Sequence, residues 1–384
     1  MILKMKNINK LTSEHKSPLL YIWIFILVYL MLSETAVLEV LSNYNGYVTF
    51  ATILVCTLFE VINNYSYSKT EFMFAVFVIV LFFQGVFLGH ISIMAEIFFY
   101  LFVLRKVNKK QLVRTTLYTI IVVLFFVVVL CACQIIPDTI VLIDGRLRFS
   151  LGFLYPSKLQ TYLMLVIFLW INAGFSRKNH IKGLVLLNLI VITCFLFTDA
   201  KYPFYISLMV SILSVLSILV PCRIKKGELI LYLFAMLVPL MPAVLSFIYN
   251  PNIRFLVKLN ELLTGRLSLS LAAISYRTLF FFNYAPNISV QQGTEGIYGY
   301  LDSGYLYVMY NYGIYLFIAV VLLVLIAIYG AMKKKDDQFI IIIVGTIVYS
   351  MWYGHVITYL QYSIPILLCT FYIPWKRRVR RFLC

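Results

Sequence analysis

Basic residues gather in and beside two long polar segments, residues 136–157 and 250–302, of a chain that is otherwise mostly apolar. Moving Lys or Arg towards hydrocarbon costs about 2.5 to 3.5 kcal/mol, so cations placed there need an anionic partner. Arginine predominates, and its planar guanidinium gives two parallel hydrogen bonds to a phosphate. We expect a phosphate ligand, with contact to lipid headgroups as the alternative. The residues concerned are Arg146, Arg148, Lys158, Lys201, Arg254, Lys258, Arg266 and Arg277.

Two of these arginines share a spacing that favours one face of a helix. Arg266 and Arg277 are eleven residues apart, about three helical turns. Leu267, Leu271 and Ile274 follow the apolar stripe of the same helix, which would lie along a membrane surface.

Acidic and histidine side chains near these segments are the candidates for a general base. Asp302 is the foremost of them, although it is equally suited to capping a helix that begins near Ser303. Lone histidines in tight turns are more often hydrogen-bonded structural residues. The other candidates are Glu295, Asp144, His90 and His355.

The composition requires a membrane around these residues. Of the 384 residues, 62% are hydrophobic and 12% are charged. A single core cannot bury the apolar surface of so many hydrophobic side chains. A hydrocarbon layer of about 30 Å takes about 20 apolar residues in a helix. We predict about twelve spans, near residues 19–41, 48–64, 71–88, 91–104, 112–135, 158–174, 181–197, 203–221, 229–249, 303–331, 338–354 and 356–374.

The Lys and Arg clusters in the short loops predict the orientation of these spans. Cytoplasmic loops hold an excess of basic residues, and the clusters recur at intervals that place both termini on the cytoplasmic side. The net charge of +17 is therefore a topology signal, and we expect no nucleic-acid partner. Cysteine spacings predict neither disulfides nor zinc, and the first span is long enough to stay as an anchor. We expect one all-α polytopic domain, residues 1–384, roofed by the outer loops 136–157 and 250–302.

Four short segments then resemble motifs of the Wzy-type polymerases of bacterial O-antigen and capsular polysaccharide, which are related to the O-antigen ligases. RLRFSLGFLYPS, residues 146–157, is similar to Arg-x-Ser-Leu-Gly-Phe-x-His-Pro-Asn, with Tyr155 and Ser157 in place of His and Asn. LLTGRLSL (262–269) and LDSGYLYVMYNYGIYLF (301–317) resemble later motifs of the family. TDAKYPFY (198–205) stands where the family often carries Thr-x-Ser-Arg, so Lys201 replaces that arginine.

This resemblance implies a GT-C-like helical fold, a bacterial plasma membrane and a glycosyl transfer at its outer face. The growing glycan would pass from undecaprenyl pyrophosphate to a new carrier-linked repeat unit, without a cofactor and with a chain-length regulator as a possible partner. Arg266 and Asp302 would be catalytic. The pyrophosphate would be bound by Arg146, Arg148, Lys201, Arg266 and Arg277.

The residues also fit this chemistry without the resemblance. A pyrophosphate donor brings its own leaving group, so the protein chiefly neutralises charge and orients two substrates. No outer Asp-x-Asp pair is present for a metal ion, so we expect a metal-independent transferase.

Two other functions stay open at this stage. One is a ligase that moves the finished polymer to another acceptor. The other is a flippase for lipid-linked oligosaccharides, which carboxylates within spans favour. Those carboxylates are Glu34, Glu39, Glu60 and Glu96, of which Glu96 is the least explained. The sequence has neither an internal repeat nor a GxxxxGK loop, and both absences count against a transporter.

Overall fold

The computed structural model describes residues 17–62, 67–87, 93–143, 145–219, 227–263, 265–275, 279–283, 301–354, 357 and 359–375. Within these ranges seven helices are long and apolar enough to cross a membrane, and three further apolar helices are shorter. The predicted class, an all-helical membrane protein, is confirmed at this level. The strands of the described residues are a single hairpin, β1 (Ile140–Ile143) with β2 (Arg146–Phe149).

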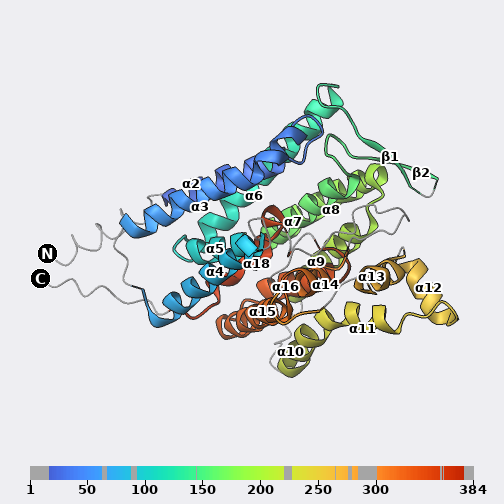
Figure 1. The fold of residues 1–384 in the computed structure, drawn as a ribbon. Helices are drawn as coiled ribbons and strands as arrows, with labels where there is room; N and C mark the ends of the chain where they lie inside the picture. Colours follow the sequence, from blue (N-terminus) through green and yellow to red (C-terminus); the bar gives the residue numbers. More distant parts are fainter. Residues whose placement is uncertain are drawn as a thin grey trace, which may run out of the picture.

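The helices lie side by side, and the hairpin, α12 and α13 share one end of the molecule (Figure 1). We call it the hairpin end. In chain order the helices are α2 (Pro18–Leu32), α3 (Asn45–Ile62), α4 (Lys69–Phe87), α5 (Ile93–Leu104), α6 (Lys109–Ala132), α7 (Pro156–Asn172), α8 (Arg177–Thr198), α9 (Lys201–Leu219), α10 (Glu228–Leu237), α11 (Met241–Ile248), α12 (Arg254–Leu262), α13 (Arg266–Ser275), α14 (Gly304–Asn311), α15 (Ile314–Lys334), α16 (Asp337–Trp352) and α18 (Ile364–Leu368). Short 3-10 turns are η1 (Glu39–Tyr44), η3 (Val238–Leu240), η4 (Leu360–Tyr362) and η5 (Cys369–Phe371).

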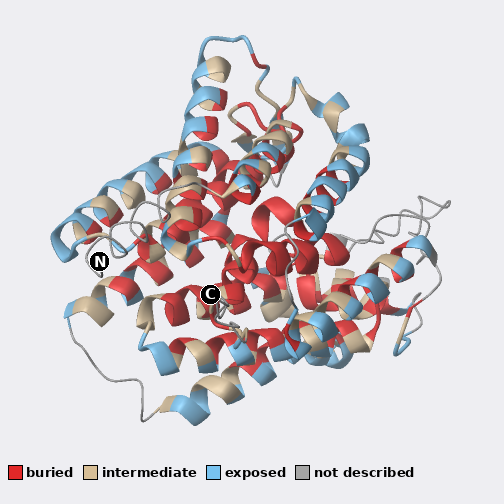
Figure 2. Cartoon of the chain, turned by 90° about the vertical axis from the view of Figure 1, so that its left-hand side faces the viewer, coloured by how far each residue is buried: buried red, intermediate tan, exposed pale blue. Residues whose placement is uncertain are grey.

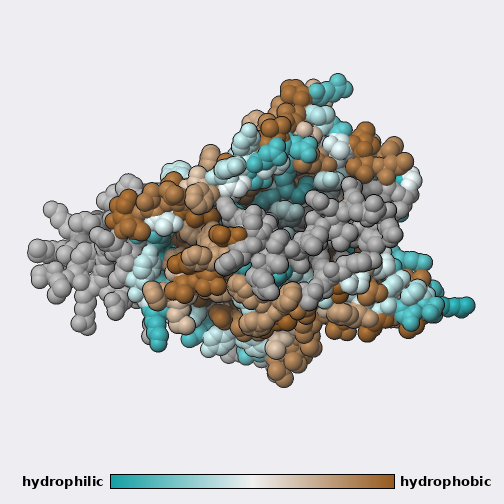
Figure 3. Space-filling model, in the orientation of Figure 1, coloured by the Kyte–Doolittle hydropathy of each residue, from teal (hydrophilic) through white to brown (hydrophobic). Residues whose placement is uncertain are grey.

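Helix α7 is the centre of the bundle. Nearly all of its side chains are buried, and it packs against α6, α8, α9 and α16. Figure 2 shows buried residues gathered in the middle of the bundle, with exposed faces on the surrounding helices. Those exposed faces are apolar: Phe72 and Phe83, both of α4, are 62% and 63% exposed. Much of the surface is correspondingly hydrophobic in Figure 3, as lipid contact requires.

Basic residues mark the end of the bundle opposite to the hairpin. Lys109 Nζ lies 2.7 Å from Asp336 Oδ2, and it also contacts the Tyr372 hydroxyl. The Arg114 guanidinium donates to the carbonyl of Ala173 over 3.1 Å. These contacts bring the starts of α6 and α16 together with the turn after α7. We call this the basic end.

Several predicted spans are broken in the structure, and proline or glycine accounts for two of the breaks. The span 229–249 contains η3 between α10 and α11, at Pro239 and Pro242. The described part of the span 356–374 is η4, α18 and η5 instead of one helix. The span 303–331 is split into α14 and α15 at Gly313.

Gly313 has a φ of +107°, and a Cβ there would lie 2.5 Å from the carbonyl oxygen of Phe281. Only glycine fits this joint without strain. The buried Gln84 of α4 fixes it further, because its side-chain amide donates to the carbonyls of Asn283 and Tyr312 over 2.7 and 2.6 Å. The α14–α15 joint is thus attached to α4.

The two long segments predicted as loops contain regular structure. The first holds the hairpin, in which Val141 pairs with Arg148. The Asp138 carboxylate accepts the backbone N–H groups of Ser150 and Leu151 over 2.9 and 2.8 Å and anchors the hairpin's base. The second holds α12 and α13. Of the predicted helix that holds Arg266 and Arg277, the part Arg266–Ser275 is α13, with Leu267 fully buried, and Arg277 lies outside the described residues.

A buried ion pair joins three parts of the chain at the hairpin end. Lys158 Nζ, in the first turn of α7, lies 2.5 Å from Glu34 Oε1, just beyond α2. Gln361 of η4 donates to the same oxygen over 3.1 Å, and the Tyr162 hydroxyl donates to Glu34 Oε2 over 2.7 Å. The Tyr362 hydroxyl also donates to Oε2. Each hydrogen-bonding site of this carboxylate is therefore used inside the protein.

We expect Glu34→Gln to lower the free energy of unfolding by about 3 to 5 kcal/mol, because it leaves the Lys158 cation buried without its charge partner. Denaturant titration of the purified protein in mixed micelles measures this. The double variant Glu34→Gln/Lys158→Met should lose less stability than Glu34→Gln alone. The exposed Glu39→Gln is the control, with a change within about 0.5 kcal/mol. Equal losses in the single and double variants would contradict this account.

Candidate anion-binding site at the hairpin end

The first part of the site is an ion pair between the two residues predicted to be catalytic. Arg266 Nε lies 3.4 Å from Asp302 Oδ2. Arg266 is the first residue of α13, and Asp302 directly precedes the cap of α14. Residues 36 positions apart in the chain are thus brought together by the packing of α13 against Leu301 and Leu306, which form a common apolar cluster with Ile274.

The start of α13 is held by a single amide side chain. The Asn260 carbonyl oxygen accepts the backbone N–H groups of Leu267 and Ser268 over 2.9 and 3.2 Å. Gly265, with a φ of +81°, makes the sharp turn between α12 and α13. Asn260 therefore satisfies N–H groups that a helix start leaves open, and it fixes the direction in which Arg266 enters the site.

The second part is a pair of hairpin arginines on one carboxylate. Arg146 Nη1 and Arg148 Nη2 lie 3.0 and 3.6 Å from Asp199 Oδ2. Asp199 stands in the left-handed region, with a φ of 43°, between α8 and α9. Phe149 of the hairpin contacts Phe197 of α8, with ring centroids 6.4 Å apart, and holds β2 against this corner.

Two tyrosines lie beside Arg266. The Arg266 guanidinium carbon is 5.8 Å from the ring centroid of Tyr202 and 5.4 Å from that of Tyr353. The Tyr353 hydroxyl is hydrogen-bonded to the Ser157 side chain, and the charges of Arg266, Asp302 and Arg148 all act on it. Tyr202 also follows Asp199 by three residues at the start of α9, so the two ion pairs are neighbours.

The structure brings together some of the predicted site residues and leaves others apart. Arg266 contacts both Tyr353 and Asp302, and Arg148 lies beside the neighbouring Asp199. Arg146 lies at the exposed rim of the group. Lys201 is exposed at the start of α9 and has no ion pair with any described residue. Outside the described residues lie Arg277, Glu295, Asp144, His90 and His355.

Cations exceed carboxylates in this group. Among the described residues of the site, Arg146, Arg148, Lys201 and Arg266 oppose only Asp199 and Asp302, a net charge of +2. The Arg148 Nε atom is buried and has no hydrogen-bond partner in the described structure. An anion that brings two negative charges would balance the site and satisfy this donor.

Asp302 is not the cap of the following helix, so the capping alternative is wrong. The cap is Ser303, whose hydroxyl accepts the backbone N–H of Leu306 over 3.4 Å. Burial raises the pKa of the Asp302 carboxyl, and the adjacent Arg266 guanidinium partly opposes this rise. A half-buried carboxylate with a raised pKa and no structural cap to make is suited to accept a proton.

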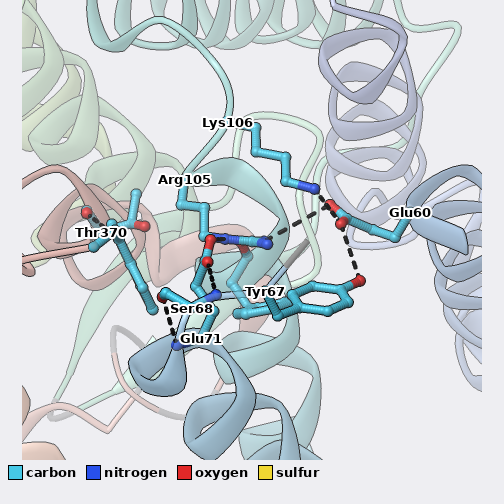
Figure 4. A network of polar contacts seen from close by, with 9 residues as sticks. Glu60, Tyr67, Ser68, Glu71, Arg105, Lys106 and Thr370 are labelled. Atoms are coloured by element: carbon cyan, nitrogen blue, oxygen red, sulfur yellow. Dashed lines mark hydrogen bonds and ion pairs between the residues drawn. The ribbon is translucent and has the colours of Figure 1, made fainter. Parts of the chain in front are cut away.

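Two of the carboxylates that favoured a transporter have charge partners in the structure. Glu34 is paired with Lys158, as described above. Glu60 lies near Arg105 and Lys106 in the network of Figure 4, with its Oε1 atom 3.7 Å from Arg105 Nη1. Glu96 is buried in the first turn of α5 without an ion-pair or hydrogen-bond partner among the described residues.

Sequence reasoning missed Asp199, Tyr202 and Tyr353. The first two lie in the TDAKYPFY segment, which was singled out for Lys201 alone. Tyr353 follows α16 and carried no signal except its neighbour His355. Ser157, noted as a departure from the family motif, occupies the site through its bond to Tyr353.

Comparison with known proteins gives no relative: no protein-family model, no curated protein and no solved structure matches this chain.

We expect the Asp302 carboxyl to titrate above the usual range for aspartate, about 3.9, because burial disfavours its ionised form. Arg266→Gln should raise its pKa further, since the variant removes the cation that opposes burial. Infrared difference spectroscopy against pH follows the protonated-carboxyl band, and Asp302→Asn identifies the component that belongs to this residue. An Arg266→Gln midpoint at or below that of the wild type would refute the coupling.

Proposed function

We propose that this protein is a glycosyltransferase that polymerises oligosaccharide repeat units carried on undecaprenyl pyrophosphate, at the outer face of a bacterial plasma membrane. The observation that supports this best is the excess of arginine over carboxylate in the neighbouring ion pairs of Asp199 and Asp302. The sequence motifs that resemble the Wzy-type polymerases contribute Arg148, Ser157, Arg266 and Asp302 to the same group.

The proposal includes the orientation of the chain. About twelve crossings, with both termini in the cytoplasm, put the basic end inside and the hairpin end outside. The two long segments, 136–157 and 250–302, then form the roof of the outer site. The contacts of Lys109 with Asp336 and of Arg114 with Ala173 agree with this orientation, since they gather the basic clusters at one end.

In the proposed reaction Arg148 and Arg266 bind the pyrophosphate of the donor, with Arg146 and Lys201 at the rim. An acceptor sugar hydroxyl attacks the anomeric carbon of the donor glycan while the bond from that carbon to the pyrophosphate oxygen breaks. Asp302 takes the hydroxyl proton, and undecaprenyl pyrophosphate leaves with the electron pair of the broken bond. The guanidinium groups stabilise the charge that develops on the leaving oxygen.

A gene-deletion host tests the function directly. We expect wild-type protein to restore long surface glycan, and Arg148→Ala, Arg266→Ala and Asp302→Asn to leave single repeat units that are still exported and attached. The readout is the size distribution of the surface glycan, at matched membrane abundance of each variant. Arg254→Ala is the control, because this arginine is exposed on α12 at the same end. This variant should leave the size distribution of the surface glycan normal.

Other outcomes of the same experiment would replace the proposal. Lipid-linked repeat units that accumulate on the inner face would indicate a flippase. Long polymer that forms but stays on its carrier would indicate a ligase. Full polymerisation by Arg266→Ala would refute the assignment of the arginine site.

Binding of the carrier can be measured without turnover. We expect Arg148→Ala and Arg266→Ala each to weaken binding of undecaprenyl pyrophosphate by the purified protein about tenfold or more, since a hydrogen bond to a charged group contributes about 1.5 to 3 kcal/mol. Arg148→Lys should lie between wild type and Arg148→Ala, because Lys keeps the charge without the planar fork. Titration of the lipid in nanodiscs measures this, and unchanged affinity in both alanine variants would count against the site.

A further inference from the structure

A groove of about 790 Å³ opens between α3 and α4, away from the site described above. The two helices make few contacts with each other, and α5 packs against both and forms the floor. The lining is almost wholly apolar. Its polar groups are Thr57, Glu60 and Tyr67, and the last two lie at the basic end.

The groove is about as long as one leaflet is deep. On α3 its lining runs from Phe50 to Val61, and on the facing side from Tyr67 to Val86. The eleven residues of the α3 wall rise about 17 Å. Half of a hydrocarbon layer of about 30 Å is about 15 Å, so the groove matches a chain that enters from one leaflet and stops near the midplane.

Charged residues line the basic end of the groove, which we call its mouth. Figure 4 shows Tyr67, Arg105 and Lys106 directed towards Glu60. The Tyr67 hydroxyl donates to Glu60 Oε2 over 3.4 Å, and Lys106 Nζ is paired with the same oxygen. Arg105 Nε lies 2.9 Å from Glu71 Oε1, and its guanidinium is stacked on Phe102, with 3.6 Å from the guanidinium carbon to the ring centroid.

This mouth carries a positive charge beyond what its carboxylates neutralise. Arg105, Lys106 and the exposed Lys69 oppose Glu60 and Glu71, a net charge of +1. The Arg105 side chain is only 2% exposed, and its Nη2 atom has no hydrogen-bond partner in the described part of the chain. Basic pockets between membrane helices are suited to the phosphate of an anionic lipid headgroup.

We infer that this groove binds an anionic phospholipid of the leaflet at the basic end, with one acyl chain between α3 and α4 and the headgroup phosphate at Lys106 and Lys69. The chain length matches one leaflet, and the charge at the mouth selects the headgroup. A neutral phospholipid would fill the same groove without using the excess charge.

The test compares two phospholipids with the same chains, dioleoyl-phosphatidylglycerol and dioleoyl-phosphatidylcholine, on the purified full chain in detergent. Native mass spectrometry measures how much of each lipid stays bound. We expect the phosphatidylglycerol to be retained in preference. Lys106→Gln should weaken its retention about fivefold, the effect of about one basic residue at an anionic surface. Lys178→Gln, an exposed lysine of α8 outside the groove, should leave retention unchanged.

The groove itself is tested by filling it. Ala75→Trp places an indole within the lining and should abolish retention, whereas Val76→Trp, on an exposed face outside the lining, should preserve it. Thr57→Phe fills the groove from the opposite wall and gives an independent variant should Ala75→Trp not fold.

Equal retention of the two lipids, or unchanged retention in both filling variants, would overturn the proposal. Displacement of phosphatidylglycerol by an equal concentration of undecaprenyl phosphate would also overturn it, since the groove would then bind an isoprenoid. None of these readouts involves glycan transfer, so this inference and the proposed polymerase fail independently.

Discussion

The need to neutralise a cation inside an apolar bundle determines much of the hairpin end. Lys158 stands buried in the first turn of α7, the helix at the centre of the bundle, where little water can solvate it. Its ion pair with Glu34 requires the chain beyond α2 to lie against α7. Gln361 and Tyr362 donate hydrogen bonds to the same Glu34 carboxylate and so attach the turn before α18 to this point. The segment that follows the hairpin is held at the same junction, since the backbone N–H of Leu154 donates to the Glu34 carbonyl and Thr35 pairs with Phe153.

Length and hydropathy predicted much of the bundle, because a membrane demands long apolar helices whatever their sequence. They did not predict the joints. The joint at Gly313 is anchored by Gln84, which comes from a helix more than two hundred residues earlier. A partner so distant in the chain cannot be predicted from the residues around Gly313. The division of residues 364–371 between α18 and η5 likewise has no signal that a hydropathy window detects.

For the candidate site, residue type was a better guide than helical spacing. Arginines in polar segments of an apolar chain need anions, and Arg146, Arg148 and Arg266 are indeed grouped near one corner of the bundle. Their immediate partners were harder to predict. Asp199 pairs with the hairpin only because β2 packs against the end of α8, and Tyr353 reaches Arg266 from the far end of α16. Such contacts follow from tertiary packing, which a single sequence does not reveal.

The α14–α15 joint affects how Asp302 is positioned. This carboxylate directly precedes the eight-residue helix α14, whereas the long helix α15 begins only after the glycine joint. The direction of α14 is therefore set separately from that of α15, by the joint and by the packing of α14 against α11, α15 and α16. The hydrogen bonds from Gln84 give α4 a direct hold on that joint. The start of α14, next to Asp302, and its end, held by α4, thus lie only one short helix apart.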